Sequence, residues 1–195
     1  MKENKILIDK HSCALALEKI KHGEVIIYPT DTLYGFGADA TNSEAIKKIN
    51  LIKKRISPLS IILSSIDDIQ TYAYINEFIM DKITTLLPGP YTLLLKSKNN
   101  SNLSKYIQAG SDLIGIRVIK ENFCNELIDR LSKPIVTTSV NIHTQKPLTK
   151  VDSIYSHFKN IPFFHKDNDL VSKGSTIINF SVMPEVVVRY GDGKY

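Results

Sequence analysis

Apolar residues recur at helical spacing in several separate stretches of the chain. The clearest stretch follows Thr41-x-x-Glu44, a capping-box pattern, and places Ala45, Ile46 and Ile49 on one face. Residues 12–22 form a second amphipathic stretch, which ends at Gly23, a typical helix stop. The same reasoning predicts further helices over residues 66–73, 77–87, 123–131 and 152–158, the last with Asp152 as its cap.

Short apolar runs between these helices predict buried strands. The first covers residues 25–28, and the others cover 59–63, 91–96, 113–119, 135–139, 175–180 and 185–190. Helices and strands alternate, but some consecutive strands are joined by segments too short for a crossover helix. We therefore expect an α/β fold with a mixed sheet and flanking helices. The polar segment 97–105 indicates a surface loop, because neither flank has enough strands for a separate core, and residues 1–195 should form a single domain.

Composition and charge narrow the function only slightly. The chain has 195 residues, of which 43% are hydrophobic and 23% charged, and this excludes a disordered or collagen-like protein. Its net charge of +5 permits an anionic partner such as a nucleotide, phosphate or RNA, although many cytosolic proteins are equally basic. Cys13 and Cys124 lack metal-ligand spacing, and no segment suggests a leader peptide or a membrane span. We expect a cytoplasmic protein without a membrane partner.

Polar residues and glycines are concentrated directly after the first predicted strand. Thr30 and Thr32 are two positions apart, so in an extended segment both hydroxyls would share one face. Gly35 and Gly37 would let the backbone turn tightly and let a ligand approach closely. This density of polar residues suits a small polar ligand, although turn residues at a strand exit produce the same pattern.

Two further pairs of polar residues follow predicted elements. Lys53 and Arg55 would point the same way only if the helix ends there, and Pro58 favours an extended chain just before it. Two converging cations outside the core could hold a polyphosphate, and a basic helix end is the alternative. Ser139 and Asn141 could place a hydroxyl and an amide on one face at a strand end, unless they only form a turn.

Charged and hydroxyl side chains also occur within or beside the remaining strands. Arg117 lies inside an apolar strand, so it needs an anionic partner or a solvent-facing side, the commoner case. Arg189 poses the same question, and Ser175 could donate a hydroxyl at a strand start. The segment Gly191-Asp-Gly-Lys194 is not a phosphate-binding P-loop, because it lacks the upstream glycine and the following helix.

Taken together and in order, these segments resemble the YrdC-like family of threonylcarbamoyl-adenylate synthases, in its short, single-domain form. The resemblance covers residues 20–191. Two departures stand out: Ser57 replaces a lysine that often precedes Pro-Leu, and Ile142-His-Thr144 lacks the usual second serine and glycine. Seven pieces carry the resemblance: Tyr28-Pro-Thr-Asp-Thr-Leu-Tyr-Gly-Phe-Gly37, Lys53-x-Arg55 with Pro58-Leu-Ser60, Leu87-Pro-Gly-Pro-Tyr-Thr92, Ile116-Arg-Val118, Ser139-Val-Asn141, Ser175-Thr-Ile-Ile178 and Arg189-x-Gly191.

The resemblance implies synthesis of L-threonylcarbamoyl-AMP from ATP, L-threonine and bicarbonate or CO₂, with release of pyrophosphate. The product would serve N6-threonylcarbamoyladenosine modification of tRNA next to the anticodon, through a downstream tRNA threonylcarbamoyl-transferase. The implied fold is a twisted sheet with a basic concave cavity. Mg²⁺ would enter on ATP rather than on protein side chains. The implied roles are catalysis for Lys53, Arg55, Ser139 and Asn141, threonine binding for Thr30, Thr32 and Arg117, and nucleotide binding for Tyr34, Lys53, Arg55, Ser139, Asn141, Ser175 and Arg189.

Two other functions compete with this one. A non-catalytic module for double-stranded RNA or tRNA would suit the basic charge, but no stacking motif of aromatic and basic residues is present. Carbamoyl-adenylate chemistry on another acceptor amine is the second alternative.

Overall fold

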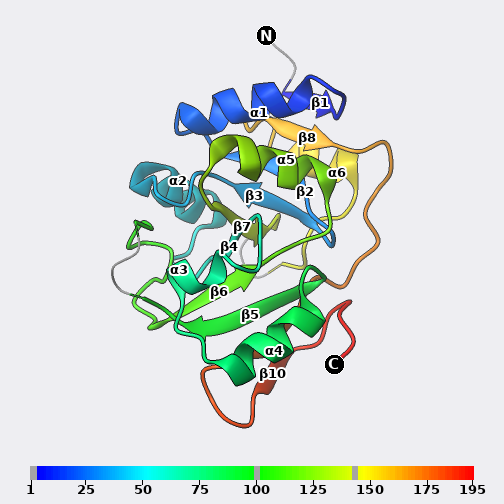
Figure 1. Ribbon diagram of the computed structural model, residues 1–195. Helices are drawn as coiled ribbons and strands as arrows, with labels where there is room; N and C mark the ends of the chain where they lie inside the picture. The colour runs from blue at the N-terminus through cyan, green and yellow to red at the C-terminus, as the bar shows by residue number, and fades with distance from the viewer. Residues whose placement is uncertain (1–3, 99–101, 142–144) are drawn as a thin grey trace.

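A computed structural model describes residues 4–98, 102–141 and 145–195 (Figure 1). Within these residues, ten strands form one sheet in the order β1-β8-β2-β3-β7-β4-β6-β5-β9-β10. The strands are β1 (Lys5–Leu7), β2 (Ile26–Pro29), β3 (Tyr34–Gly37), β4 (Ser60–Ile62), β5 (Tyr91–Lys96), β6 (Leu113–Arg117), β7 (Ile135–Ser139), β8 (Phe163–His165), β9 (Thr176–Asn179) and β10 (Val186–Arg189). The helices are α1 (Ser12–Lys21), α2 (Ser43–Lys53), α3 (Ile69–Tyr72), α4 (Glu77–Leu86), α5 (Asn122–Leu131) and α6 (Val151–His157).

The sheet is mixed, as the sequence predicts. Strand β2 pairs antiparallel with β3, because the turn between them is too short for a crossover helix. Strand β4 pairs parallel with β6 and antiparallel with β7, and β5 pairs parallel with β9. This order brings β3, β7, β4 and β6 together at the centre, although their positions in the sequence are far apart.

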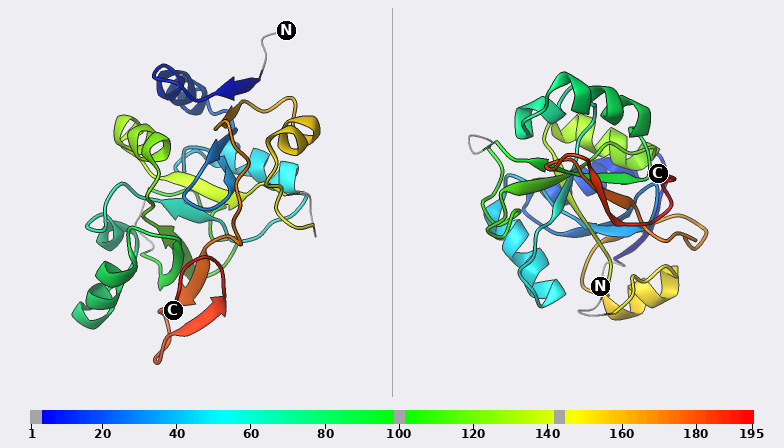
Figure 2. Two further views of the ribbon diagram at one scale, coloured as in Figure 1. Left: turned by 90° about the vertical axis from the view of Figure 1, so that its right-hand side faces the viewer. Right: turned by 90° about the horizontal axis from the view of Figure 1, so that it is seen from below.

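Helices cover both faces of the sheet, and hydrophobic residues pack on both faces of β2. Figure 2 shows α1, α3, α4 and α5 on one side and α2 and α6 on the other. Ile26 packs with residues of α1 and α5, whereas its neighbour Ile27 packs in the larger cluster with Ile46 of α2 and Ile154 of α6. Adjacent residues of a strand point to opposite faces, so a two-sided core explains the continuous apolar runs.

Most predicted elements are present, but three strands escape the sequence pattern. Strands β5 and β7 have the predicted bounds, and the predicted helices are found with small shifts at their ends, except that α3 covers only half of the predicted residues 66–73. Strands β1 and β8 have three residues each, too few for a periodic signal. Strand β3 has the sequence YGFG, whose glycines suggest a turn. Its glycines instead make room: a Cβ on Gly37 would lie 2.4 Å from the Tyr28 ring.

Two predicted helix caps are wrong by one or two residues. Asn42, not Thr41, caps α2, and its side chain accepts hydrogen bonds from the backbone amides of Glu44 and Ala45. Lys150 occupies the cap position of α6, and Asp152 lies in the first turn. An acidic residue in the first turn still complements the helix dipole, so the predicted helix forms without the predicted cap.

Candidate active site

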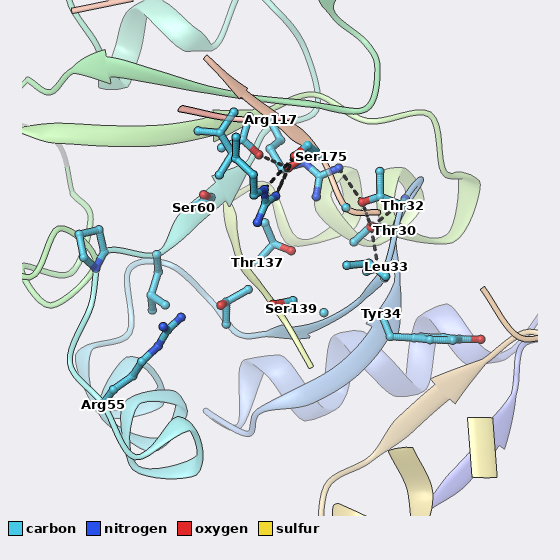
Figure 3. A pocket seen from close by; sticks show the side chains of 18 residues that line it. Thr30, Thr32, Leu33, Tyr34, Arg55, Ser60, Arg117, Thr137, Ser139 and Ser175 are labelled. Carbon is cyan, nitrogen blue, oxygen red and sulfur yellow. Dashed lines mark hydrogen bonds between the residues drawn. The ribbon is translucent and has the colours of Figure 1, made fainter. Parts of the chain in front are cut away.

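A cavity of about 210 Å³ opens beside the central strands (Figure 3). Figure 3 shows Arg55 at one end of it and Thr30 and Thr32 at the other. Its lining is rich in hydroxyl groups and in arginines, the groups that bind anionic and polar ligands. These side chains belong to Thr30, Thr32, Ser60, Thr92, Thr137, Thr138, Ser139 and Ser175 and to Arg55, Arg117 and Arg189.

The two predicted threonines meet in the turn between β2 and β3. The hydroxyl oxygens of Thr30 and Thr32 lie 3.2 Å apart, and the Thr30 hydroxyl donates to the carbonyl of Leu33 at 2.7 Å. The Thr32 backbone amide donates to the Thr30 hydroxyl at 3.1 Å. The hydroxyls are therefore neighbours, as predicted, but a tight turn and not an extended segment brings them together.

Arg117 is buried and paired, contrary to the commoner case of an exposed strand face. Its side chain is 7% exposed, and Nη2 donates to Asp31 Oδ1 at 2.5 Å and to the Thr32 hydroxyl at 3.2 Å. Burial raises the pKa of Asp31, and the Arg117 charge opposes that shift. Asp31 Oδ2 and Arg117 Nε have no hydrogen-bond partner among the described residues. This buried wall therefore keeps an acceptor and a donor available beside the threonine hydroxyls.

Strands β5 and β10 and the residue before β9 contribute a second hydroxyl cluster and a second arginine, close to Arg117. The Ser175 hydroxyl bonds the Thr92 hydroxyl at 2.7 Å. Arg189 donates from Nη2 to the Ser175 carbonyl at 2.7 Å and to its hydroxyl at 3.1 Å. Partial burial, together with the nearby charge of Arg117, lowers the pKa of Arg189. Two like charges near one cavity favour an anionic ligand between them.

The helix ends at Lys53, so Arg55 lies outside it, and of the two cations only Arg55 lines the cavity. Lys54 ends α2 in the left-handed conformation with φ 51°, so Arg55 leaves the helix and reaches the cavity. Lys53 is 2% exposed, which corrects the expectation that it lies outside the core. Its ammonium donates to the Ser139 carbonyl at 2.7 Å and to Asn141 Oδ1 at 2.5 Å. Burial, followed by the charge of Arg55, lowers the pKa of Lys53 to about 8.

The predicted Ser139 and Asn141 pair is adjacent at the end of β7. The Ser139 hydroxyl donates to Asn141 Oδ1 at 3.4 Å, and Asn141 Nδ2 donates to the Gln145 carbonyl at 3.0 Å. Ser139 lines the cavity, whereas Lys53 and Asn141 lie behind it. The departure at residues 142–144 lies outside the described residues.

Tyr34 borders the cavity, but its ring packs in the hydrophobic core. The side chain is completely buried and packs edge-on against Phe163, with ring centroids 5.2 Å apart. Its hydroxyl accepts a hydrogen bond from the Lys166 amide at 3.1 Å. In Figure 3 the ring points away from the threonines. Tyr34 therefore connects β3 to the segment after β8, beside the cavity.

A second cavity, of about 310 Å³, contains none of the predicted site residues. Its charged groups include Asp68, Asp129 and Lys133, and Lys133 forms an ion pair with Asp39 at 2.8 Å. We therefore place the site at the smaller cavity, where Arg55 and Arg189 lack a carboxylate partner among the described residues. Within residues 4–98, 102–141 and 145–195, no cluster of three metal-binding side chains occurs, and no helix is long and apolar enough to cross a membrane.

Three residues of the site belong to the sequence motifs but had no predicted role. Asp31 is part of the polar segment after β2, and Thr92 and Ser60 end two other motifs. Their position in the motifs was the only signal, because a lone Asp, Ser or Thr two residues after a proline is also typical of turns. The structure identifies them by contact: Asp31 with Arg117, Thr92 with Ser175, and Ser60 in the cavity lining.

Comparisons with known proteins give one consistent family. The family model Sua5_yciO_yrdC, described as telomere recombination, matches residues 18–191. A Methanocaldococcus jannaschii protein provisionally named threonylcarbamoyl-AMP synthase is 38% identical over 183 residues, which cover 91% of this chain and 79% of that protein. The threonylcarbamoyl-AMP synthase of Bos taurus is 28% identical over 176 residues, which cover 86% of this chain and 63% of that protein.

A solved structure agrees with the sequence comparison. The crystal structure of P. abyssi Sua5 complexed with L-threonine superposes with a TM-score of 0.85 at 27% identity. The match covers 95% of this chain and 56% of the Sua5 chain, so this chain spans little more than half of that relative.

Proposed function

Because the chain belongs to the Sua5/YciO/YrdC family, we propose that it makes L-threonylcarbamoyl-AMP from ATP, L-threonine and bicarbonate or CO₂, releasing pyrophosphate. One observation carries this proposal: each of the seven sequence motifs contributes a residue to the lining of one cavity. These residues are Thr30, Arg55, Thr92, Arg117, Ser139, Ser175 and Arg189. Residues scattered from β2 to β10 would not gather in this way if each motif were only a local turn.

The reaction needs two bond-forming steps at one place. The threonine amine adds to CO₂ and loses a proton, which gives a carbamate. A carbamate oxygen then attacks the α-phosphorus of ATP, and the bond to the β-phosphate oxygen breaks as pyrophosphate leaves. Negative charge accumulates on phosphoryl oxygens, so positioning and cations are more important than a nucleophilic side chain.

The buried wall suits the amino acid. Thr30 and Thr32 present hydroxyls that can bond the threonine substrate, and the Arg117 guanidinium attracts its carboxylate. Arg117 is already paired with Asp31, so the substrate carboxylate would share this cation with Asp31. A pre-paired arginine is held in place before the substrate arrives, which lowers the entropy cost of binding.

Two other arginines suit the triphosphate. Arg55 and Arg189 form no ion pair within the residues that the structure describes, so both charges can act on phosphate oxygens. Ser139 and Ser175 would bond phosphate or carbamate oxygens, and Tyr34 would border the nucleotide. Lys53 would act from behind, by holding the Ser139 carbonyl and Asn141 Oδ1. We expect Mg²⁺ to enter on the phosphates of ATP, held mainly by phosphate oxygens and water.

The product would pass to a tRNA threonylcarbamoyl-transferase for modification of the adenosine next to the anticodon. The reactive mixed anhydride would hydrolyse if it left the site long before transfer, so direct delivery to this partner is expected. Cys13 and Cys124 are free and buried, which supports a reducing compartment such as the cytoplasm. Direct binding of tRNA or double-stranded RNA would then be an additional property, and the comparisons support the synthase over a purely RNA-binding module.

The deciding experiment is incubation with ATP, Mg²⁺, bicarbonate and L-threonine, followed by mass analysis for threonylcarbamoyl-AMP and an assay for pyrophosphate. We expect both products, and we expect neither when threonine or bicarbonate is omitted. Pyrophosphate release that ignores threonine would contradict the proposal. A parallel series with serine, glycine and simple amines tests carbamoyl-adenylate chemistry on another acceptor.

A further inference from the structure

The chain returns to the cavity after β10 and holds its wall from outside. Asp192 bonds the turn that leads from the β8–β9 connection into β9. The Ser172 hydroxyl donates to Asp192 Oδ2 at 2.5 Å, and the Lys173 amide donates to Oδ1 at 3.0 Å. The Asp192 amide in turn donates to the Gly174 carbonyl at 2.8 Å. We call these five residues, Ser172 to Gly174 with Gly191 and Asp192, the clasp.

Two glycines allow the clasp to close. Gly174 has φ +86°, a conformation that L side chains rarely adopt, and its amide donates to the Ser172 hydroxyl at 2.9 Å. A Cβ on Gly191 would lie 2.1 Å from the Gly174 carbonyl oxygen, so the two backbones touch there. The sequence Gly191-Asp-Gly-Lys194, which is not a P-loop, thus has a structural use in bringing Asp192 to this turn.

The clasp ends where the cavity wall begins. Gly174 and Ser175 both line the cavity, and Ser175 directly follows the clasp. The Ser175 carbonyl accepts from Arg189 Nε at 3.2 Å and from Nη2 at 2.7 Å. Arg189 has no carboxylate partner among the described residues, so the carbonyl and hydroxyl of Ser175 orient its guanidinium. A shift of the Ser172–Gly174 turn would therefore move Ser175 and release Arg189.

We propose that Asp192 is a positioning residue for Arg189 in its role as a nucleotide-binding residue of the cavity. It acts through the turn and Ser175 on Arg189, and it touches no substrate itself. This inference rests on the proposed function, because it takes ATP as the ligand of Arg189. The carboxylate supplies two acceptors, one for the Ser172 hydroxyl and one for the Lys173 amide. An asparagine has one acceptor oxygen and satisfies only one of these donors.

The test is equilibrium binding of Mg²⁺-ATP by titration calorimetry, with the thermal midpoint of each variant measured alongside. We expect Asp192→Ala to weaken ATP binding about 5- to 30-fold, the size of one or two lost hydrogen bonds. Asp192→Asn should lie between this variant and the wild type, and Ser172→Thr, which keeps the hydroxyl, should bind almost normally. The control is Asp67→Ala, since Asp67 is exposed and outside the cavity lining.

A double-variant cycle separates positioning from simple destabilisation. If Asp192 acts through Arg189, Asp192→Ala should weaken ATP binding less than about 2-fold in an Arg189→Ala background. A full additional loss in that background overturns the proposal, as does unchanged ATP affinity of the folded Asp192→Ala variant. A different result would contradict the proposed function alone: ATP affinity falls in Asp192→Ala as expected, but the wild type forms no threonylcarbamoyl-AMP.

Discussion

The two ends of the cavity hold their positive charges in opposite ways. At the threonine end, Arg117 is buried, paired with Asp31 and bonded to Thr32. At the phosphate end, Arg55 is exposed and, among the described residues, has no ion-pair partner. Water screens an exposed charge much more than a buried one. The two arginines should therefore differ in how much each contributes to the stability of the fold.

This difference separates residues that the fold needs from residues that only the substrate needs. Removal of one member of a buried ion pair leaves an uncompensated charge in a medium of low dielectric constant. Removal of an exposed cation costs the fold little, because water had already solvated it. Substitutions at the threonine end should therefore lower the unfolding free energy, and substitutions at the phosphate end should lower kcat.

The largest expected effect is on stability at the threonine end. Asp31→Asn removes the charge that balances Arg117, and we expect unfolding free energy to fall by about 3 kcal/mol, the lower end for a broken buried pair. Urea denaturation measures this change. Glu126→Gln is the control, since Glu126 forms an exposed pair with Arg130 on α5 and should cost at most about 0.5 kcal/mol.

A double variant sharpens this result. Arg117→Met in the Asp31→Asn background removes the orphaned charge, and part of the lost stability should return. If Asp31→Asn alone leaves the urea midpoint unchanged, the pair is not the buried structural contact that its 2.5 Å separation suggests.

The second effect is on turnover at the phosphate end. Arg55→Ala should lower kcat by about 10²- to 10³-fold, because the arginine stabilises charge on the departing pyrophosphate. The thermal midpoint should barely move, since the side chain is exposed. Lys21→Ala on α1 is a matched removal of an exposed cation and should change neither quantity. A folded Arg55→Ala variant with normal kcat would remove Arg55 from the site.

The sequence alone predicted many of the helices and strands and part of the cavity lining. Hydrophobic periodicity identifies helices such as α5 and strands such as β7, because burial of one face depends on neighbours in the sequence. The motifs also contain the hydroxyl and arginine residues that line the cavity, and their residue types alone suggest a polar, anion-binding site. Local pattern therefore pointed to many of the residues that line the cavity, although it gave no role to Ser60 or Thr92.

How those residues are paired could not be predicted from local pattern. Asp31 and Arg117 are 86 positions apart, in the turn after β2 and at the end of β6, and they meet only in the tertiary structure. The burial of Lys53 likewise depends on the end of β7, which no periodicity in α2 reveals. A lysine at a helix end is usually exposed, so only the tertiary structure reveals that the Lys53 ammonium is buried behind Ser139.

The third effect divides the substrates at the threonine end. Thr32→Val keeps the shape and removes a hydroxyl that bonds Arg117, so the KM for threonine should rise about 5- to 150-fold, as one lost buried hydrogen bond predicts. The KM for ATP should change much less. Steady-state kinetics with each substrate varied in turn measure this split. Thr85→Val, at an exposed position on α4, is the control, and an equal rise in both KM values would place Thr32 elsewhere.

The last effect tests Lys53, which is buried like Arg117 but has no carboxylate within ion-pair distance among the described residues. Burial lowers its pKa to about 8 from 10.5, so the folded protein releases this proton before the unfolded chain does. Below pH 8 both states are protonated and stability does not depend on this group. Between pH 8 and 10.5 the unfolded chain binds more protons, so unfolding free energy should rise with pH, by at most about 1.4 kcal/mol per unit.

The measurement is the unfolding free energy from urea denaturation, for wild type and Lys53→Met, across this pH range. The contributions of other titrating groups cancel in the difference between the two proteins. A flat difference would mean that the two acceptor oxygens keep the ammonium charged, and Lys53 would then resemble the paired Arg117 in its electrostatics.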